Sequence, residues 1–67
     1  MFIVVEFQKS AQGIACLVND YADRGDAEAK YHTVLTAASK TSLLKHGATM
    51  LTEDGVYIKS ECYGTEA

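Results

Sequence analysis

RGDAEAKYHTVLTAASKTS, residues 24–42, is the only part of this 67-residue chain with a sustained helical period. At about 100° per residue, five of its side chains fall in one narrow apolar stripe: Ala27, Tyr31, Val34, Leu35 and Ala38. Asp23 precedes the stretch, and we expect its carboxylate to cap the first turn by accepting from the free amides there. Thr41 and Ser42 are weak helix formers, so the helix is expected to end near them.

The opposite side of this helix carries small residues and little charge. Its members are Ala29, Thr33, Thr36 and Ala37, with Lys40 as the only charge near its centre. Small side chains let a second helix approach closely, and this favours a subunit interface. A merely low-charge surface is an equally good interpretation.

Two pairs of strand-like segments flank the helix. Residues 2–9 and 14–21 are rich in β-branched and aromatic side chains, and residues 10–13 form a turn that ends in Gly13. Residues 48–53 and 56–63 flank Asp54-Gly55, a strong hairpin signal, and residues 43–47 connect the helix to them. We therefore predict one α+β domain over residues 1–63 with a short tail at 64–67. Its architecture is hairpin, helix, hairpin (ββαββ), with a four-stranded antiparallel sheet and the helix on one face.

One helix covers four strands poorly, which predicts self-association. Hydrophobic residues make up 48% of the chain, and a domain this small is marginal without help. Ile3, Val5 and Phe7 alternate with Phe2 and Val4, and we expect the latter pair, with Leu17 and Leu51, on the bare face. In the last strand Val56, Ile58, Ser60 and Cys62 form the core-like set. A homodimer or higher oligomer is expected, with Phe2 and Val4 joining the small helix residues in the interface.

Composition argues against several classes of function. A net charge of −3 disfavours sequence-independent nucleic-acid binding, and no apolar run is long enough to span a membrane. Cys16 and Cys62 match no metal-ligand spacing, so neither a metal nor a cofactor is expected. The opening MFIVVEFQKS lacks the basic start of a secretory signal, which favours a cytoplasmic protein with reduced, mostly buried thiols. A single Cys16–Cys62 disulfide is the alternative.

Candidate ligand-binding residues gather around the helix start and the aromatic side chains. Arg24 and the free amides near Gly25 could hold an anion such as a phosphate. Tyrosines could stack a base, although Tyr31 is expected in the core. The full set of candidates is Arg24, Gly25, His32, Tyr57, Lys59 and Tyr63. A hydrolase using Glu28 and His32 is disfavoured, because no oxyanion donor accompanies them.

Three segments carry a resemblance to a known group of proteins. AEAKYHTVLTAAS (27–39), MLTEDG (50–55) and IKSECY (58–63), with Glu6-Phe7-Gln8 near the start, resemble small proteins of phages and prophages of Firmicutes that have no assigned activity. The chain departs from that group near Leu44, where its members often carry Pro. The resemblance implies a phage-encoded accessory protein in the cytoplasm of a bacterial host cell.

Together these observations predict a binding protein rather than an enzyme. The first hypothesis is a homo-oligomer that sequesters a small nucleotide-like host immune signal at a subunit interface. The alternative, of nearly equal weight, is a protein-interaction module that inhibits a host protein or serves as a minor phage assembly component.

Overall fold

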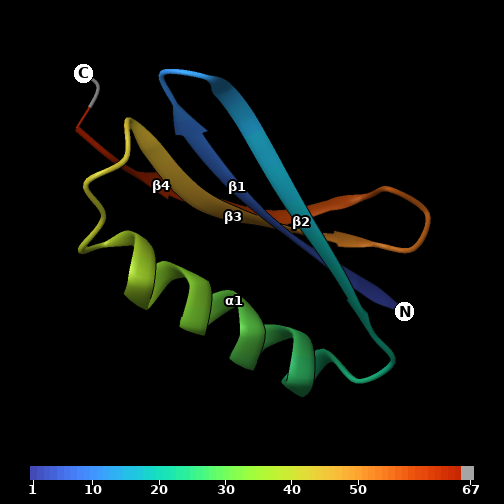
Figure 1. Cartoon of the computed structure of the whole chain (residues 1–67). Helices are drawn as coiled ribbons and strands as arrows, with labels where there is room; N and C mark the ends of the chain where they lie inside the picture. The colour runs from blue at the N-terminus through green and yellow to red at the C-terminus, as the bar shows by residue number, and fades with distance from the viewer. Residues whose placement is uncertain (66–67) are drawn as a thin grey trace.

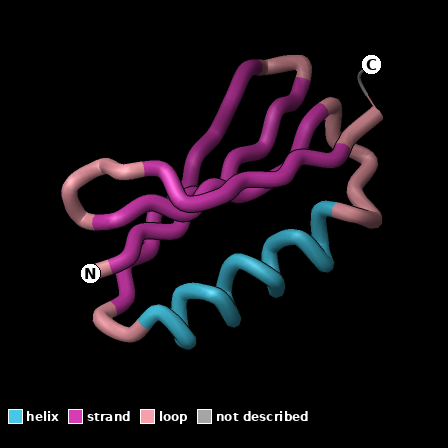
Figure 2. Tube along the Cα trace, turned by 180° about the vertical axis from the view of Figure 1, so that it is seen from behind, coloured by secondary structure: helices cyan, strands magenta, loops and turns pink. Residues whose placement is uncertain are grey.

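A computed structural model describes residues 1–65 of the chain. Its elements are β1 (Phe2–Ser10), β2 (Gly13–Tyr21), α1 (Arg24–Ala38), β3 (Lys45–Thr52) and β4 (Tyr57–Tyr63). The strands form one antiparallel sheet in the order β2-β1-β3-β4, and α1 lies across one face of it (Figures 1 and 2). The predicted α+β fold, a four-stranded antiparallel sheet with one helix, is confirmed.

Both predicted hairpins are present. β1 and β2 pair from Phe2↔Tyr21 to Ser10↔Gly13, and Gly13 closes the loop with a φ of +124°. Gly55 in the β3–β4 turn has a φ of +83°. Both values lie in a region that side chains other than glycine rarely adopt, so these residues determine where the chain reverses.

The core lies between α1 and the two central strands, β1 and β3. The apolar stripe of the helix is buried as predicted, with Leu35 partly so. The stripe meets strand residues that are wholly buried: Val4, Ala48 and Met50. Because three of the seven buried apolar residues are alanines, the interior is small for a chain of this length.

The faces of β1 are the reverse of the prediction. Val4 is wholly buried beneath α1, and Phe2 packs against the same core. Alternation along a strand shows which residues share a face, but it does not show which of the two faces the helix covers. A shift of one residue in that assignment exchanges the buried and the bare face. Leu17 lies opposite Glu6 on the helix side, whereas Leu51 pairs with Ile3 on the bare side as expected.

The bare side of the sheet is therefore a different set of residues, which we call the uncovered face. By strand pairing its apolar members are Ile3, Val5 and Phe7 of β1, Ile14, Cys16 and Val18 of β2, Leu51 of β3, and Tyr57 and Cys62 of β4. Its polar members are Lys9, Asp20, Lys45, Thr49 and Ser60.

A register shift alters the faces of β4. Met50 pairs with Lys59, but Leu51 pairs with Tyr57, so Ile58 is an extra residue that packs against the core. Val56 and Ser60 are exposed, so only Ile58 of the predicted core set reaches the core. Cys16 and Cys62 are exposed free thiols, and the prediction of mostly buried thiols is wrong.

The helix ends at Ala38, earlier than predicted. The Ser39 N–H still donates to Leu35 O, but the next two amides bond three residues back, which tightens the last turn. Asp23 is the N-cap residue, yet its side chain makes no capping hydrogen bond, contrary to expectation. Its carbonyl accepts from the Ala27 N–H instead.

The connector between α1 and β3 lies earlier than the predicted residues 43–47, because α1 ends at Ala38 and β3 begins at Lys45. His46 and Gly47 are thus strand residues, and both are buried. A Cβ on Gly47 would lie 2.8 Å from both Cys62 Cα and Phe7 Cζ, so the close packing of β3 needs glycine here. Thr65 donates its N–H to Leu43 O, while residues 66 and 67 of the predicted tail lie outside the described part. Within residues 1–65 no helix has the length and apolar character to cross a membrane.

Candidate functional site

A groove of about 470 Å³ runs between α1 and the edge strand β4. Small-molecule sites usually fall between about 300 and 1,000 Å³, so the groove is large enough for a small ligand. The helix contributes Tyr31, His32 and Thr36 to its lining, and β4 contributes Lys59, Glu61 and Tyr63.

Glu28, beside the groove, is the centre of a cluster of charged groups. Lys59 Nζ donates to Glu28 Oε1, and Arg24 Nε donates to Oε2 at 3.4 Å. His32 Nε2 lies 3.6 Å from Oε1. The hydrogen bond from Lys59 lowers the pKa of Glu28 below its usual value, and Arg24 adds to the effect. The carboxylate therefore holds cations from both the helix and the sheet beside the groove.

Aromatic rings flank the same cation. Lys59 Nζ lies 4.9 Å from the centroid of the Tyr31 ring, within cation–π distance. Tyr31 and His32 meet edge to face with centroids 5.6 Å apart. The Tyr63 hydroxyl donates to Glu61 at 3.1 Å, and this hydrogen bond raises the pKa of Tyr63. The groove is thus lined by Lys59, whose ammonium lies over the Tyr31 ring, and further along β4 by the phenol of Tyr63.

The structure brings together most of the predicted ligand residues. His32, Lys59 and Tyr63 line the groove, and Arg24 is joined to them through Glu28. Gly25 is exposed beside Arg24 at the start of the helix. Tyr57 is separated from the others, because it lies on the uncovered face, where its hydroxyl is 3.4 Å from Ser60 Oγ.

The predicted interface residues divide into two groups. The small residues of the helix are exposed: Ala29, Thr33, Thr36 and Ala37. Both threonine hydroxyls donate to carbonyls one turn back at 2.9 Å, so this surface presents few unused polar groups. Val4 cannot contribute to an interface, because it is fully buried in the core, and Phe2 packs on the helix side.

Sequence reasoning missed a buried polar pair on the helix-covered face. His46 Nε2 lies 2.7 Å from Glu6 Oε2, which also accepts from Gln8 Nε2 at 3.1 Å. Among the described residues, His46 Nδ1 is buried without a hydrogen-bond partner. The sequence did show that Glu6 and Gln8 lie on the same side of β1 as Val4. Because that side was predicted to be the bare one, neither side chain was expected beneath the helix.

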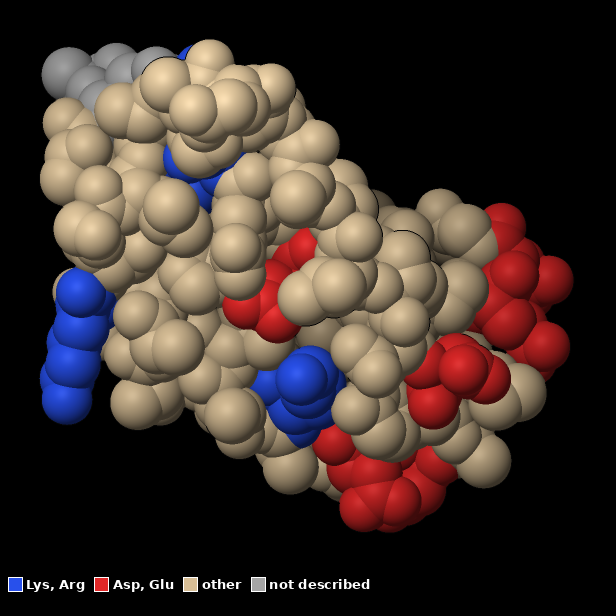
Figure 3. Space-filling view, in the orientation of Figure 1, with Lys and Arg blue, Asp and Glu red and all other residues tan. Residues whose placement is uncertain are grey.

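Charge is unevenly distributed along the molecule. The acidic side chains gather at the end where the β3–β4 turn and the start of α1 lie (Figure 3). Within residues 1–65, no group of three His, Cys, Asp or Glu side chains is arranged to hold a metal ion.

Comparison with known proteins produced no match to a protein-family model, to a curated protein or to a solved structure.

Proposed function

We propose that this chain is a small homo-oligomeric binding protein that sequesters a nucleotide-like ligand in the α1/β4 groove. The observation that carries the proposal is the position of Lys59, which lies over the Tyr31 ring within a groove that Tyr63 also lines. An aromatic surface beside a cation is suited to a molecule that combines a base with a phosphate.

The charges around Glu28 support an anionic ligand. In the unliganded chain this carboxylate accepts from Lys59 and Arg24, and His32 is nearby. A phosphate entering the groove would offer the same donors a stronger acceptor of the same sign. Glu28 is fixed to the helix, so it would stay beside the phosphate and share the donors Lys59 and Arg24 with it.

Thr36 supports the placement of the ligand near a subunit interface. It lines the groove and also belongs to the small-residue surface of the helix. A second subunit packed on that surface would close one side of the groove. The phage origin and the cytoplasm of a bacterial host are part of the proposal through the sequence resemblance alone.

Calorimetry tests the proposal directly. The purified chain is titrated with a panel of nucleotides, dinucleotides and cyclic nucleotides, and a saturable heat with at least one member is expected. Lys59→Met removes the cation from the groove and should reduce that heat, while Lys40→Met, a lysine not among the groove residues, serves as the matched control. No heat with any member of the panel contradicts the proposal.

A protein-interaction role is the second candidate, and the uncovered face favours it. Ile14, Val18 and Tyr57 on that face are 66%, 64% and 61% exposed, and they are spread over both edge strands of the sheet. An inhibitor of a host protein or a phage assembly component would use such a surface. Affinity capture from host and infected-cell lysates separates the candidates, because a ligand-sequestering protein recovers no stoichiometric partner.

A further inference from the structure

We infer that the uncovered face is the interface of a two-fold homodimer, in which two sheets pack face to face with their strands antiparallel. The inference rests on the oligomeric part of the proposed function and identifies a second interface, separate from the small-residue surface of α1 beside the groove. The partner is a second copy of this chain, and the area and charge of the face both indicate this.

The face has the dimensions that a stable dimer requires. The Cα atoms of the chain extend over 33 × 20 × 16 Å, so a sheet face spanning the two longer directions covers roughly 660 Å² in projection. A standard interface buries about 800 Å² per partner, and side chains add area to the projection. Because the extents are those of the whole chain, this projected area is an upper bound for the sheet, and a second sheet of equal size would cover most of the face.

The middle of the face is uncharged and mainly apolar, with Thr49 and Ser60 as polar members in the row of Val5. Phe7 pairs with Cys16 and Gly47, and Gly47 pairs with Cys62, which gives one row across all four strands. The row that contains Val5 and Val18 lies next to it. These two rows lie on either side of position 6, near the middle of β1. A two-fold axis close to that position therefore places the Phe7 row of one subunit over the Val5 row of the other.

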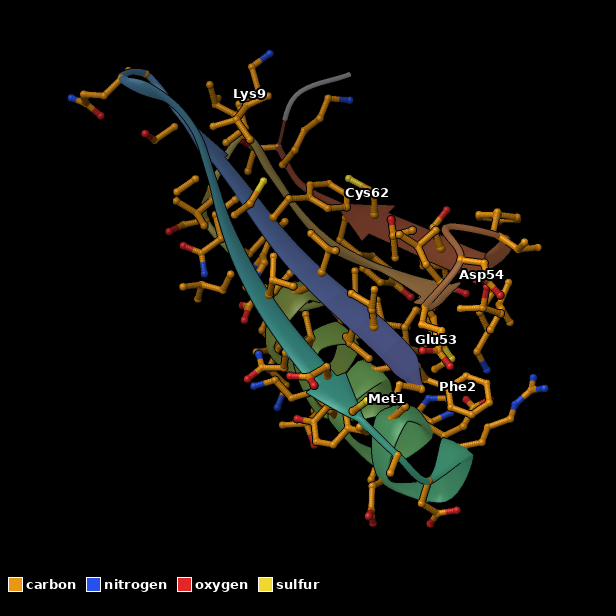
Figure 4. All side chains as sticks on the ribbon, turned by 90° about the vertical axis from the view of Figure 1, so that its right-hand side faces the viewer. Met1, Phe2, Lys9, Glu53, Asp54 and Cys62 are labelled. Atoms are coloured by element: carbon orange, nitrogen blue, oxygen red, sulfur yellow. The ribbon has the colours of Figure 1, made fainter. Side chains whose placement is uncertain are left out.

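The ends of the face carry opposite charges. Lys9 and Lys45 are opposite each other at one end of the central strands, and each also has an interaction within its own chain. Asp20 pairs with Ile3 near the other end, where the β3–β4 turn adds Asp54 and also Glu53, whose carboxylate is ion-paired with the N-terminal amine of Met1 (Figure 4). With antiparallel strands, the basic end of one copy lies over the acidic end of the other, at both ends of the dimer. Parallel packing would place like charges together, so the charge pattern selects the antiparallel arrangement.

This dimer leaves the ligand groove accessible. The helices lie on the outer sides of the two packed sheets, because each covers the opposite face of its own sheet (Figure 2). Dimer formation and ligand binding are therefore separable. Packing of helices from two such dimers would give a tetramer, which mass measurement distinguishes from the dimer.

Light scattering on two neighbouring variants tests the inference. Val18→Asp places a charge on the uncovered face, and Leu17→Asp, at a site that is 57% exposed on the opposite side of the same strand, is the matched control. We expect wild type and Leu17→Asp to have at least twice the 7.3 kDa chain mass and Val18→Asp to have half the wild-type mass. Ile14→Asp, at the basic end of the same face, repeats the test if Val18→Asp does not fold by circular dichroism.

Cys16 and Cys62 provide an independent measurement. Both thiols are exposed in the single chain and lie on the uncovered face. A thiol reagent should react at least tenfold more slowly with the wild type at high concentration than with Val18→Asp. A wild-type chain that is monomeric at millimolar concentration overturns the inference, as does a dimer that Val18→Asp leaves intact or that Leu17→Asp also dissociates. If the chain is a dimer but shows no heat of binding with any nucleotide, the interface is supported and only the proposed ligand is contradicted.

Discussion

His46 Nε2 lies 2.7 Å from Glu6 Oε2, and only 8% and 13% of their side-chain surfaces are exposed. The two residues come from the central strands of the sheet and face the helix side, so an ionisable pair lies largely buried on the face that α1 covers. The hydrogen bond from His46 is the main reason that the pKa of Glu6 lies below its usual value of 4.5.

Stability should depend on pH through Glu6. Because the folded pKa of Glu6 is lowered, its contribution is fully present above the unfolded value of 4.5 and is lost as pH falls through the folded value. Urea unfolding at pH 7 and at steps from pH 5.5 to 3 should show a steeper loss of free energy in wild type than in Glu6→Gln. At pH 7 the substitution should cost about 1–3 kcal/mol, as for a buried hydrogen bond to a charged group. Asp54→Asn in the exposed turn is the control, and an equal slope in Glu6→Gln and wild type contradicts the prediction.

Gly47→Ala should destabilise the sheet. The new Cβ would contact Glu61 O and lie 2.8 Å from Cys62 Cα, and neither backbone atom can move without disturbing the pairing of β3 with β4. We expect a loss of at least about 2 kcal/mol in the free energy of unfolding, measured by urea denaturation.

Gly25→Ala is the matched control for that substitution. Its Cβ would meet the side-chain Oδ2 of Asp23 at 3.1 Å, which can rotate away, and alanine favours a helix over glycine by up to about 1 kcal/mol. Unchanged or increased stability is expected. If both alanine variants lose stability equally, the close contact at Gly47 is not the cause.

Removing Lys59 should change the titration of Glu28. The hydrogen bond from Lys59 is the largest cause of the lowered pKa of Glu28, and the contribution of Arg24 is smaller. In Lys59→Met, the Glu28 pKa should rise towards 4.5, as followed by carboxyl carbon shifts in an NMR titration. Arg24→Met should produce a smaller rise in the Glu28 pKa. A larger rise in Arg24→Met than in Lys59→Met would contradict the prediction that Lys59 is the main cause of the lowered pKa.

The tyrosines should differ in their effect on ligand affinity. Tyr63 lines the groove, whereas Tyr57 lies on the uncovered face. Stacking of a base on an aromatic side chain contributes about 1–3 kcal/mol, so Tyr63→Ala should weaken binding of the best nucleotide roughly tenfold or more. Tyr57→Ala should leave the affinity unchanged in the same calorimetric titration. A loss in both variants, or in neither, removes stacking on Tyr63 from the proposal.

The elements of this fold could be predicted because their signals are local. The Ala27–Ala38 stripe depends on a helical period, and the two turns depend on Gly13 and on Asp54-Gly55. Each signal lies within a few residues of the structure that it determines. The helix end was misplaced because the amides of Lys40 and Thr41 still bond to helix carbonyls, but three residues back instead of four, which the sequence does not distinguish from a further helical turn.

The facing of the strands could not be predicted, because it depends on contacts between distant residues. Val4 and Val5 are equally apolar, and only the position of α1 decides which of them is buried. The extra residue at Ile58 depends on the pairing of β4 with β3, and it moves Cys62 to the uncovered face. Arg24, His32 and Lys59 were predicted as ligand residues from their chemistry alone. That they meet at Glu28 could not be predicted, because it requires β4 to lie beside the helix.

The separation of Cys16 and Cys62 has a consequence for handling the protein. Two strands lie between them in the row through Phe7 and Gly47, so their Cα atoms are about 14 Å apart, and a disulfide requires less than about 7 Å. Oxidation therefore cannot close a loop within one chain and must join one chain to another. Since each chain carries two such thiols, air oxidation of dissociated chains extends into covalent polymers, which appear as a ladder on a non-reducing gel.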